Sequence, residues 1–568
     1  GEGVRRGIAC YSGETNITVI VGFKIANGFA AGYDYDGNGE IDLDINLREN
    51  SGGGLYNKSS SPILSQCVFA HNSSDTSGSG MANTGGGSPW LVECIFAANN
   101  ISDGYSGVFN DQDCTPTFDD CMFIGHVGAG PVLSNFDGMM SMSNCSFTQN
   151  SCGKGNHPVV INLAGSGSYV GCTFTDNTGT AFHMVGYSGD YSYTFTGCTF
   201  TNNTGSQGGG MYISGSNDKT MLENCTFTNN SAYHGGGAYI ESGQVTLSNC
   251  TFTGNKAVSE STAAGDGGGL FWGGIGTSTL TNCTFENNTA TRNGGGLGIT
   301  SDIYNNGSIS ITECTFSNNT ADGSGGGLSR YQEATNGSFV LTDSTFVNNV
   351  SNGTGTSYQQ GGGGMYSIGW VPNQSINQCT FLGNTAINGG GMMNYGSSIP
   401  LNGCIFRENS ATSYGGGYHS YISCCGELTN CTFENNTADF GGGAANRYAE
   451  PTISYSTFTH NVARVSGGGM YNLDSSPTLD FCTFESNEAD HDADFVCTLG
   501  GGMYNEDSSP TLNGCTFESN FAICAGGGMY NMDESNPELT NCDFIGNTVE
   551  DGNGAGMHNN ESSPTLID

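Results

Sequence analysis

Oxygen-bearing side chains at a spacing suited to calcium lie near the start of the sequence. The segment DYDGNGEID, residues 34–42, alternates acidic or amide side chains with other residues. Oxygens at alternate positions of a loop are the ligands that Ca²⁺ takes in calcium-binding loops. The twelfth position, where such loops carry an acid, holds Ile45. We expect bound Ca²⁺, with an ordinary acidic surface turn as the alternative; the expected ligands are Asp34, Asp36, Asn38, the carbonyl of Glu40, and Asp42.

Asparagine carries a second chemistry. The pattern Asn-x-Ser/Thr, the acceptor of N-linked glycans, recurs roughly twenty times. This density predicts a secreted, extracellular glycoprotein, and the alternative is chance enrichment in a chain rich in Asn, Ser and Thr. The candidate acceptors are Asn57, Asn72, Asn100, Asn202, Asn224, Asn229, Asn249, Asn282, Asn287, Asn318, Asn430 and Asn435.

Cysteine supplies a third chemistry. Of 23 cysteines, sixteen stand two residues before a phenylalanine, from Cys67 to Cys542. Side chains in register on stacked strands point the same way, so we expect mostly buried thiols, with a disulfide-stitched ladder as the alternative. Cys497 and Cys524 lie outside this series, each eighteen residues before one of its members. Because they take equivalent places on adjacent repeats, they are the disulfide candidate, and the lack of C-x-x-C pairs argues against zinc.

The sequence shows no clustering of the residue types that catalysis on polysaccharides requires. Polysaccharide lyases and hydrolases need clustered carboxylates together with a positioned base or acid. The 13 Lys and Arg residues are scattered. The arginines and histidines that fall in neighbouring repeats take different places in them: Arg407, Arg447, Arg464, His183, His234 and His460. We expect a protein that is not an enzyme, with a polysaccharide lyase or hydrolase as the alternative.

Charge narrows the choice of partners. Against 13 basic residues stand 52 acidic ones, for a net charge of -39. Such a chain repels phosphate, so nucleic acid and anionic membranes are not expected partners. No apolar run is long enough for a membrane span. The chain starts at Gly1 without a signal peptide, which we interpret as a mature or trimmed form.

An internal repeat must position all of these residues. Its unit reads G-G-G-(M/L)-Y-N, S-S-P-T-L, N-C-T-F and x-x-N, with steps of mostly 24–27 residues. Short strands between Gly and Asn turns at this period indicate a solenoid. The sequence predicts an all-β, right-handed parallel β-helix of about 18 or more rungs with Cys and Phe interior ladders. We expect an N-terminal entry rung with the acidic insertion over residues 1–50, and repeats over residues 51–568.

The period of two along a strand assigns the faces. In N-C-T-F, Cys and Phe share one side and point inward, while Asn and Thr point outward. The acceptors of this motif, such as Asn224 and Asn430, therefore face solvent. The Asn after Tyr, as at Asn57 and Asn472, is expected in a turn, with its amide bonded to the next along the axis. The glycine triplets are expected at corners with positive φ or close backbone approach.

The repeat resembles a known family. The segments FAHN at 69–72, FTDN at 174–177, FLGN at 381–384 and FIGN at 544–547, with the glycine triplets, resemble the G-G-A-I and F-x-x-N repeats of polymorphic outer membrane proteins. Members of that family are β-helical surface passengers and adhesins, so the resemblance implies a β-helix at a cell surface. The acceptor density departs from it, because it is typical of eukaryotic secreted proteins.

Together these features predict an extracellular, N-glycosylated structural β-helix of a cell surface, matrix or filament. The last residues form an ordinary repeat without a polar cap, so we expect end-to-end self-association, with a trimmed chain as the alternative. A carbohydrate-binding adhesin with carbohydrate or cell-surface partners is a second candidate. An ice-binding β-helix is a third, because outward threonines form a column: Thr173, Thr199, Thr226, Thr251, Thr284, Thr315 and Thr345.

Overall fold

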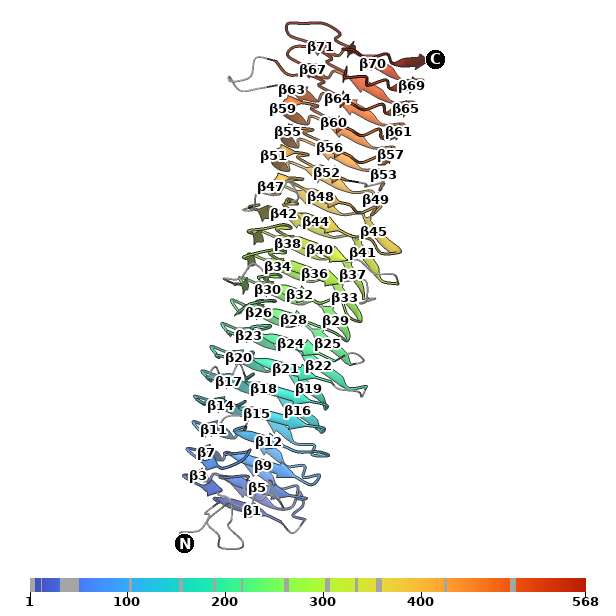
Figure 1. Ribbon diagram of the computed structural model, residues 1–568. Coiled ribbons are helices and arrows are strands. Elements are labelled where there is room, and N and C mark those ends of the chain that lie inside the picture. Colours follow the sequence, from blue (N-terminus) through green and yellow to red (C-terminus); the bar gives the residue numbers. More distant parts are fainter. Residues whose placement is uncertain are drawn as a thin grey trace, which may run out of the picture. The chain divides into compact units, whose positions relative to one another are not determined.

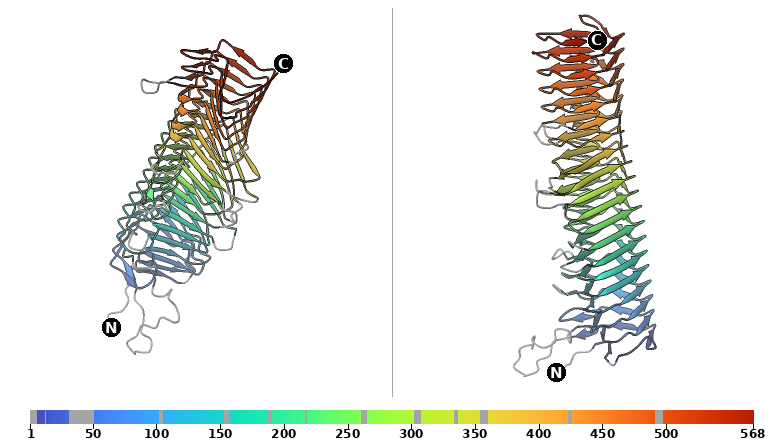
Figure 2. Two further views of the ribbon diagram at one scale, coloured as in Figure 1. Left: turned by 45° about the horizontal axis from the view of Figure 1, so that its top comes forward. Right: turned by 90° about the vertical axis from the view of Figure 1, so that its right-hand side faces the viewer.

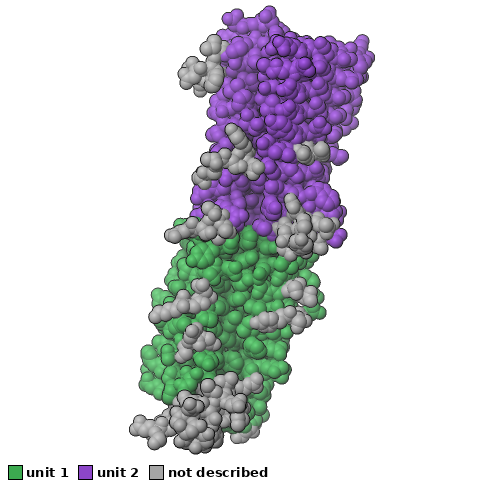
Figure 3. All heavy atoms as spheres, in the orientation of Figure 1, with its two compact units in different colours: residues 1–259, 269–278 green, residues 260–268, 279–568 purple. Residues whose placement is uncertain are grey.

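The computed structural model describes residues 6–11, 13–30, 51–101, 105–152, 157–186, 190–215, 218–259, 265–301, 307–332, 336–353, 360–422, 426–490 and 497–568. These residues form strands and turns, with no helix among them. They fall into two compact units (Figure 3): residues 1–259 with 269–278, and residues 260–268 with 279–568. Each unit is a stack of parallel coils, and together the units hold about 17 turns. The predicted all-β parallel solenoid is confirmed.

One repeat of unit 2 shows how a coil is built (Figures 1 and 2). The first strand follows the glycine triplet, the second follows Ser-Ser-Pro, the third holds the ladder Phe, and a short fourth follows the F-x-x-N corner. These strands are β60 (Met470–Leu473), β61 (Thr478–Asp480), β62 (Thr483–Glu485) and β63 (Glu488–Ala489). The next coil pairs in parallel register, Met470 with Met503 and Phe484 with Phe517. A coil inside the stack therefore finds partners for its backbone groups in the coils on either side.

The strands of unit 1 follow this order. Those of the first sheet are β1 (Ile8–Cys10), β5 (Leu55–Lys58), β9 (Met81–Thr84), β12 (Val108–Asn110), β15 (Leu133–Phe136), β18 (Val160–Leu163), β21 (Phe182–Val185), β24 (Met211–Ser214), β28 (Ala238–Ile240) and β32 (Leu270–Trp272). Those of the second are β2 (Val19–Val21), β6 (Ile63–Ser65), β10 (Trp90–Val92), β13 (Thr117–Asp119), β16 (Met139–Ser143), β19 (Ser166–Val170), β22 (Ser192–Thr196), β25 (Lys219–Glu223) and β29 (Gln244–Ser248). Those of the third are β3 (Lys24–Ala26), β7 (Val68–Ala70), β11 (Ile95–Ala97), β14 (Met122–Ile124), β17 (Ser146–Thr148), β20 (Thr173–Thr175), β23 (Thr199–Thr201), β26 (Thr226–Thr228) and β30 (Thr251–Thr253). Short strands after the third corner are β4 (Phe29–Ala30), β8 (Ser73–Ser74), β27 (Ser231–Ala232) and β31 (Lys256–Ala257).

Unit 2 repeats the pattern. Its first sheet holds β36 (Leu297–Ser301), β40 (Leu328–Gln332), β44 (Met365–Ile368), β48 (Met392–Tyr395), β52 (Tyr418–Tyr421), β56 (Ala444–Arg447), β60, β64 (Met503–Glu506), β68 (Met529–Met532) and β72 (Met557–Asn559). Its second holds β37 (Ser308–Thr312), β41 (Ser338–Thr342), β45 (Asn373–Asn377), β49 (Leu401–Asn402), β53 (Glu427–Thr429), β57 (Thr452–Ser454), β61, β65 (Thr511–Asn513), β69 (Glu538–Thr540) and β73 (Thr565–Ile567), while β33 (Thr277–Thr281) spans the sequence boundary of the units. Its third holds β34 (Thr284–Glu286), β38 (Thr315–Ser317), β42 (Thr345–Val347), β46 (Thr380–Leu382), β50 (Ile405–Arg407), β54 (Thr432–Glu434), β58 (Thr457–Thr459), β62, β66 (Thr516–Glu518) and β70 (Asp543–Ile545). Its fourth holds β35 (Thr289–Ala290), β39 (Thr320–Ala321), β43 (Val350–Ser351), β47 (Thr385–Asn388), β51 (Ser410–Tyr414), β55 (Thr437–Phe440), β59 (Val462–Ser466), β63, β67 (Phe521–Ala522) and β71 (Thr548–Val549).

Left-handed residues make the corners between strands. In the repeat of β60, Gly467 has φ 73°, Asp474 φ 48°, Phe481 φ 52° and Ser486 φ 52°. The last glycine of the triplet has a different reason. A Cβ on Gly469 would lie 2.5 Å from the carbonyl oxygen of Gly502, so only glycine allows the coils this approach. The predicted role of the triplets is confirmed.

The interior is filled by in-register columns. Ladder phenylalanines stack along the coil, and the rings of Phe484 and Phe517 lie 4.7 Å apart at an angle of 3°. The ladder cysteines of the described residues are free thiols, and all but Cys542 are buried. The prediction that the ladder cysteines are mostly buried thiols is confirmed. Stacking repeats of this kind gives each coil a core that one coil alone does not have.

A second apolar cluster lies on the outer face of the first sheet of unit 2. Tyr471, Tyr504 and Tyr530 point away from the coil interior, yet each is at most 7% exposed. Side chains at the ends of the fourth-sheet segments, among them Phe440 and Leu499, cover them. The face opposite the interior is therefore also packed, which the alternation of inward and outward residues does not predict.

Candidate functional site

A buried asparagine ladder runs along the corner after each ladder Phe, and sequence reasoning missed it. It is formed by the last residue of F-x-x-N: Asn72, Asn99, Asn150, Asn177, Asn203, Asn230 and Asn255 in unit 1, and Asn288, Asn319, Asn349, Asn384, Asn409, Asn436, Asn461, Asn487, Asn520 and Asn547 in unit 2. Asn319 shows its bonding. Its Nδ2 donates to the Phe285 carbonyl oxygen at 2.9 Å and to Asn349 Oδ1 at 2.9 Å. Its backbone N–H also donates to Asn349 Oδ1, at 3.0 Å, so the ladder satisfies corner backbone groups.

One histidine takes a place in this ladder. His126 is fully buried, with Nδ1 3.1 Å from Asn150 Oδ1 and Nε2 3.4 Å from Asn99 Nδ2. These partners fix the neutral tautomer, because Oδ1 can only accept and Nδ2 can only donate: Nδ1 carries the proton and Nε2 accepts. Burial lowers the pKa of His126 to about 4, and the hydrogen bond that His126 donates to Asn150 opposes this shift.

A second asparagine column lies inside the first sheet. Asn446, Asn472, Asn505 and Asn531 each donate to the next amide oxygen along the coil, at 2.7–2.9 Å. The predicted axial amide ladder is confirmed, and its predicted place in a turn is wrong. These residues lie in strands and point inward, as Asn57 does. Counting in steps of two from Leu55, an inward residue, places Asn57 inside, so the alternation held the signal.

Other side chains interrupt that column. In unit 1 the positions after Asn162 carry Met184, Ile213, Ile240 and Trp272. In unit 2 they begin with Ile299, then Arg330 and Ser367. The Arg330 guanidinium is fully buried, which lowers its pKa, and no carboxylate contacts it among the described residues. It donates instead to Gln332, Ser367 and Gln374 at 2.9–3.2 Å and lies over the ring of Phe339.

Ten of the twelve predicted glycan acceptors lie on the outside. Asn224, Asn249, Asn282 and Asn430 occupy the left-handed corner before the ladder Cys, and Asn202, Asn229, Asn287, Asn318 and Asn435 occupy the corner after the ladder Phe; these nine and Asn100 are exposed. A left-handed corner turns the side chain away from the coil, and Asn tolerates that conformation better than most residues. The structure therefore places two parallel outer columns of acceptor amides in each unit.

The prediction is wrong for Asn57 and Asn72. Both are 0% exposed. Asn57 Nδ2 donates to the Ser60 carbonyl oxygen at 2.8 Å, and Asn72 Nδ2 to the Ile25 carbonyl oxygen at 3.0 Å. A sugar on either nitrogen would replace these bonds and has no space inside the coil. Both asparagines belong to the interior ladders instead.

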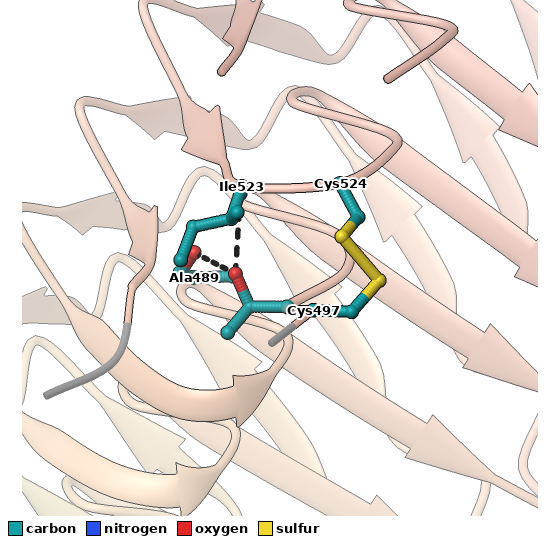
Figure 4. Close-up of a disulfide and its surroundings, with 5 residues drawn as sticks. Ala489, Cys497, Ile523 and Cys524 are labelled. Carbon is teal, nitrogen blue, oxygen red and sulfur yellow. Dashed lines mark hydrogen bonds between the residues drawn. A yellow bond between two sulfur atoms is a disulfide. The ribbon is translucent and has the colours of Figure 1, made fainter. Parts of the chain in front are cut away.

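The predicted disulfide is confirmed. Cys497 and Cys524 are bonded across adjacent coils of unit 2, with their Cα atoms 5.3 Å apart (Figure 4). Beside it, Thr498 donates to the Ala489 carbonyl oxygen and accepts from the Ile523 backbone N–H. The bridge therefore fixes a segment that also joins the two coils by hydrogen bonds.

The predicted calcium ligands, Asp34, Asp36, Asn38, Glu40 and Asp42, lie outside the described residues. Within the described residues, no three His, Cys, Asp or Glu side chains gather as a metal site.

The part of the chain that the structure describes also holds no helix able to cross a membrane. The threonines proposed as an ice-binding column are half-buried.

The structure separates the basic side chains that the sequence places in neighbouring repeats. Arg407 pairs with Glu434 at 2.7 Å, and Arg464 pairs with Asp439 at 2.6 Å. Arg447 lies apart from them, 4.1 Å above the ring of Tyr414 and 5.3 Å above that of Tyr421. His419 stands beside Tyr414, buried, and burial lowers its pKa to about 3, with the charge of Arg447 as a smaller cause.

The Arg447 cluster, defined by Arg447, His419, Tyr414 and Tyr421, has unused hydrogen-bonding capacity. Both ring nitrogens of His419 and the Nε of Arg447 find no partner among the described residues. The cluster lies on the outer face of the first sheet. Within the described part of the chain no carboxylate pairs with this guanidinium, and a guanidinium flanked by aromatic rings suits an acidic ligand.

Stacked coils with interior ladders and outer corner columns define a parallel β-helix repeat protein. The family model described as "Right handed beta helix region" matches residues 159–367 and 366–568, more than half of the chain. The chain belongs to this family.

The other comparisons add little. No curated protein matches the chain. Among solved structures, an alginate lyase of the PL6 family is similar, with 10% identity and a TM-score of 0.22 over 89% of this chain and 97% of that one. A likeness at this TM-score carries no argument about function.

Proposed function

We propose that the protein is an extracellular structural β-helix of a cell surface, matrix or filament that carries N-linked glycans on its outer corners. One observation carries the proposal. Nine of the ten exposed candidate acceptors fall into two columns at left-handed corners, whereas the asparagines that hold the coil point inward. The same residue type thus performs two separate tasks, internal bonding and outward presentation. The resemblance to polymorphic outer membrane protein repeats supports a place at a cell surface.

The glycans are tested by intact mass of the secreted protein before and after an N-glycosidase. We expect a fall in mass that corresponds to several glycans. An unchanged mass contradicts the decoration and leaves a bare structural β-helix. Bound Ca²⁺ at residues 34–42 belongs to the same proposal. It is tested by calcium titration of the wild-type chain against Asp36→Asn.

End-to-end assembly is the second part of the proposal. In such assembly a coil of one copy pairs with a coil of a second copy in parallel register, as neighbouring coils of one chain do, for example Met470 with Met503. Electron microscopy at the native concentration is expected to show filaments. Single particles at that concentration contradict end-to-end assembly.

A carbohydrate-binding adhesin is the alternative function, and the Arg447 cluster favours it. The unpaired Nε of Arg447, a buried imidazole and two tyrosine rings suit the carboxylate and the apolar face of an acidic sugar. If the wild-type protein binds sugars on a glycan array and the Arg447→Gln variant does not, the result supports this alternative. Identical array profiles for the two proteins contradict it.

A further inference from the structure

An aromatic pair occupies a corner where other coils carry Asn, Gly, Asp, Glu or Gln. The corner precedes the ladder Cys, and in two coils of unit 2 it is held by Tyr455 and Phe481. Their φ angles are 51° and 52°. Bulky side chains rarely take this left-handed conformation, whereas Gly and Asn take it readily. The two rings are also 59% and 52% exposed, so burial in the core does not explain them.

The two rings form a parallel stack along the coil. Their centroids are 5.4 Å apart and their planes differ by 10°. Phe481 in turn leans over the next corner residue, Gly514, where a Cβ would lie 2.7 Å from its ring. Phe481 thus lies between Tyr455 and the corner of the following coil, whereas Tyr455 has Phe481 on one face only. The other face of Tyr455 points toward the preceding coil.

The corner residue of the preceding coil is Asn430. The backbone N–H of Asn430 donates to the Ser454 carbonyl oxygen at 3.0 Å, one residue before Tyr455, which fixes the register. Side chains of this column lean toward the following coil: Asn144 lies over Gly171, Gln378 over Gly403, and Phe481 over Gly514. Asn430 is exposed and begins the acceptor pattern Asn-Cys-Thr. A sugar on its amide would start beside the uncovered face of Tyr455.

We propose that Tyr455, supported by Phe481, is a stacking surface for the first sugar of an N-linked glycan on Asn430. The inference rests on the proposed glycosylation. The C–H face of a pyranose ring is apolar and carries partial positive charge at its hydrogens. The face of an aromatic ring is apolar and carries negative charge, so the two attract in a parallel arrangement. The sugar takes the next place in a stack that already runs from Gly514 through Phe481 to Tyr455.

The other acceptors of the same column lack such a surface. Asn224 is followed one coil later by Asn249, and Asn282 by Glu313, because their ladder strands pair in register. Asn282 lies in the same unit, at the same corner and in the same acceptor pattern as Asn430. It is therefore the matched control: a glycan there has the same attachment and no aromatic ring beneath it.

The test uses the secreted full chain with ¹³C-labelled N-acetylglucosamine, trimmed to one sugar per site by an endoglycosidase. Asn430→Gln and Asn282→Gln assign the two sugar spectra by loss of signals. We expect the Asn430 sugar protons to lie upfield of those at Asn282. In Tyr455→Ser, the proton chemical shifts of the Asn430 sugar should become those of the Asn282 sugar, and the shifts of the Asn282 sugar should stay unchanged. A second readout is release of the sugar by an N-glycosidase under native conditions, expected to be about 2- to 10-fold faster in Tyr455→Ser.

The outcomes are distinct. If Asn430→Gln removes no sugar signal, the glycosylation of Asn430 is contradicted and the stacking falls with it. If the signal is present and Tyr455→Ser leaves it unmoved, glycosylation stands and the stacking is wrong. If unglycosylated protein binds free N-acetylglucosamine oligomers, and Tyr455→Ser abolishes this binding, the rings serve an external sugar and the proposal is overturned.

Discussion

Two buried asparagine columns run along the coils, and they differ in how strictly the side chain is kept. At the corner after the ladder Phe, unit 2 keeps Asn from Asn288 to Asn547, and unit 1 substitutes one His. Inside the first sheet, the column passes from Asn to Met, Ile and Trp in unit 1, and to Ile, Arg and Ser in unit 2. Both columns are buried and both bond amide to amide.

The difference lies in what each amide bonds to besides its neighbours. The corner amide accepts a backbone N–H and donates to a backbone carbonyl oxygen, as Asn319 does. Corner backbone groups have no strand partner, so removal of the side chain leaves them buried and unpaired. The first-sheet amides such as Asn472 bond chiefly to one another, while the strand pairs its own backbone. An apolar residue at position 472 leaves two side-chain groups, Asn446 Nδ2 and Asn505 Oδ1, without their partner, but it leaves the backbone pairing intact.

The largest effect is expected from the corner ladder. Asn319→Ala removes four hydrogen bonds to backbone and amide groups, and should lower the free energy of unfolding of unit 2 by about 3–5 kcal/mol. Asn472→Ile, in the first-sheet column, should lower it by a smaller amount, about 2 kcal/mol, because only side-chain groups lose their partners. Urea unfolding followed by circular dichroism measures both. Equal losses for the two variants would remove the distinction between the columns.

His126 sharpens the comparison through pH. Its pKa falls from 6.5 unfolded to about 4 folded because the ring is buried. Between these values the unfolded chain binds a proton that the folded chain does not, so the unfolding free energy falls as pH falls through this window. The His126 contribution should be absent above about pH 6.5 and reach about 3 kcal/mol of lost stability near pH 4.

The control for His126 is His126→Asn, which restores the ladder residue found in the other coils. The difference in unfolding free energy between the two proteins should grow from pH 7 to pH 4, with the variant more stable in acid. Unfolding curves that shift in parallel with pH for both proteins would show that His126 does not hold a neutral place in the ladder.

The smallest effect is expected at Arg330. Arg330→Met removes a buried cation, which favours folding, and leaves the Gln332 and Gln374 oxygens without their donor, which opposes it. The two effects offset, and the melting temperature should change by only a few degrees, corresponding to within about 1 kcal/mol. If Arg330→Met lowers the free energy of unfolding as much as Asn319→Ala does, the account of this column is contradicted at Arg330. The column would then accept apolar residues in place of an amide but not in place of the buried guanidinium.

The sequence was enough to predict which side chains face inward within the strands, but not at the corners between strands. The period of two within a strand correctly placed Cys225 and Phe227 inside and Asn224 outside. It failed at Asn230, because the left-handed residue Asn229 turns the chain between Thr228 and Asn230 and breaks the alternation. The same break put Asn72 inside the coil, where an acceptor pattern alone gives no sign of burial. The Cys497–Cys524 bridge was predictable because equal spacing to the ladder expresses register directly.

Glycan mapping by site tests the central claim most directly, because it asks which asparagines face outward and whether they are modified. Peptides of the secreted protein are digested, treated with an N-glycosidase in H₂¹⁸O, and analysed by mass spectrometry. The account predicts label at corner acceptors such as Asn202, Asn287 and Asn430, and none at Asn57 or Asn72. Label at Asn57 or Asn72, or an absence of label at every corner acceptor, would contradict it.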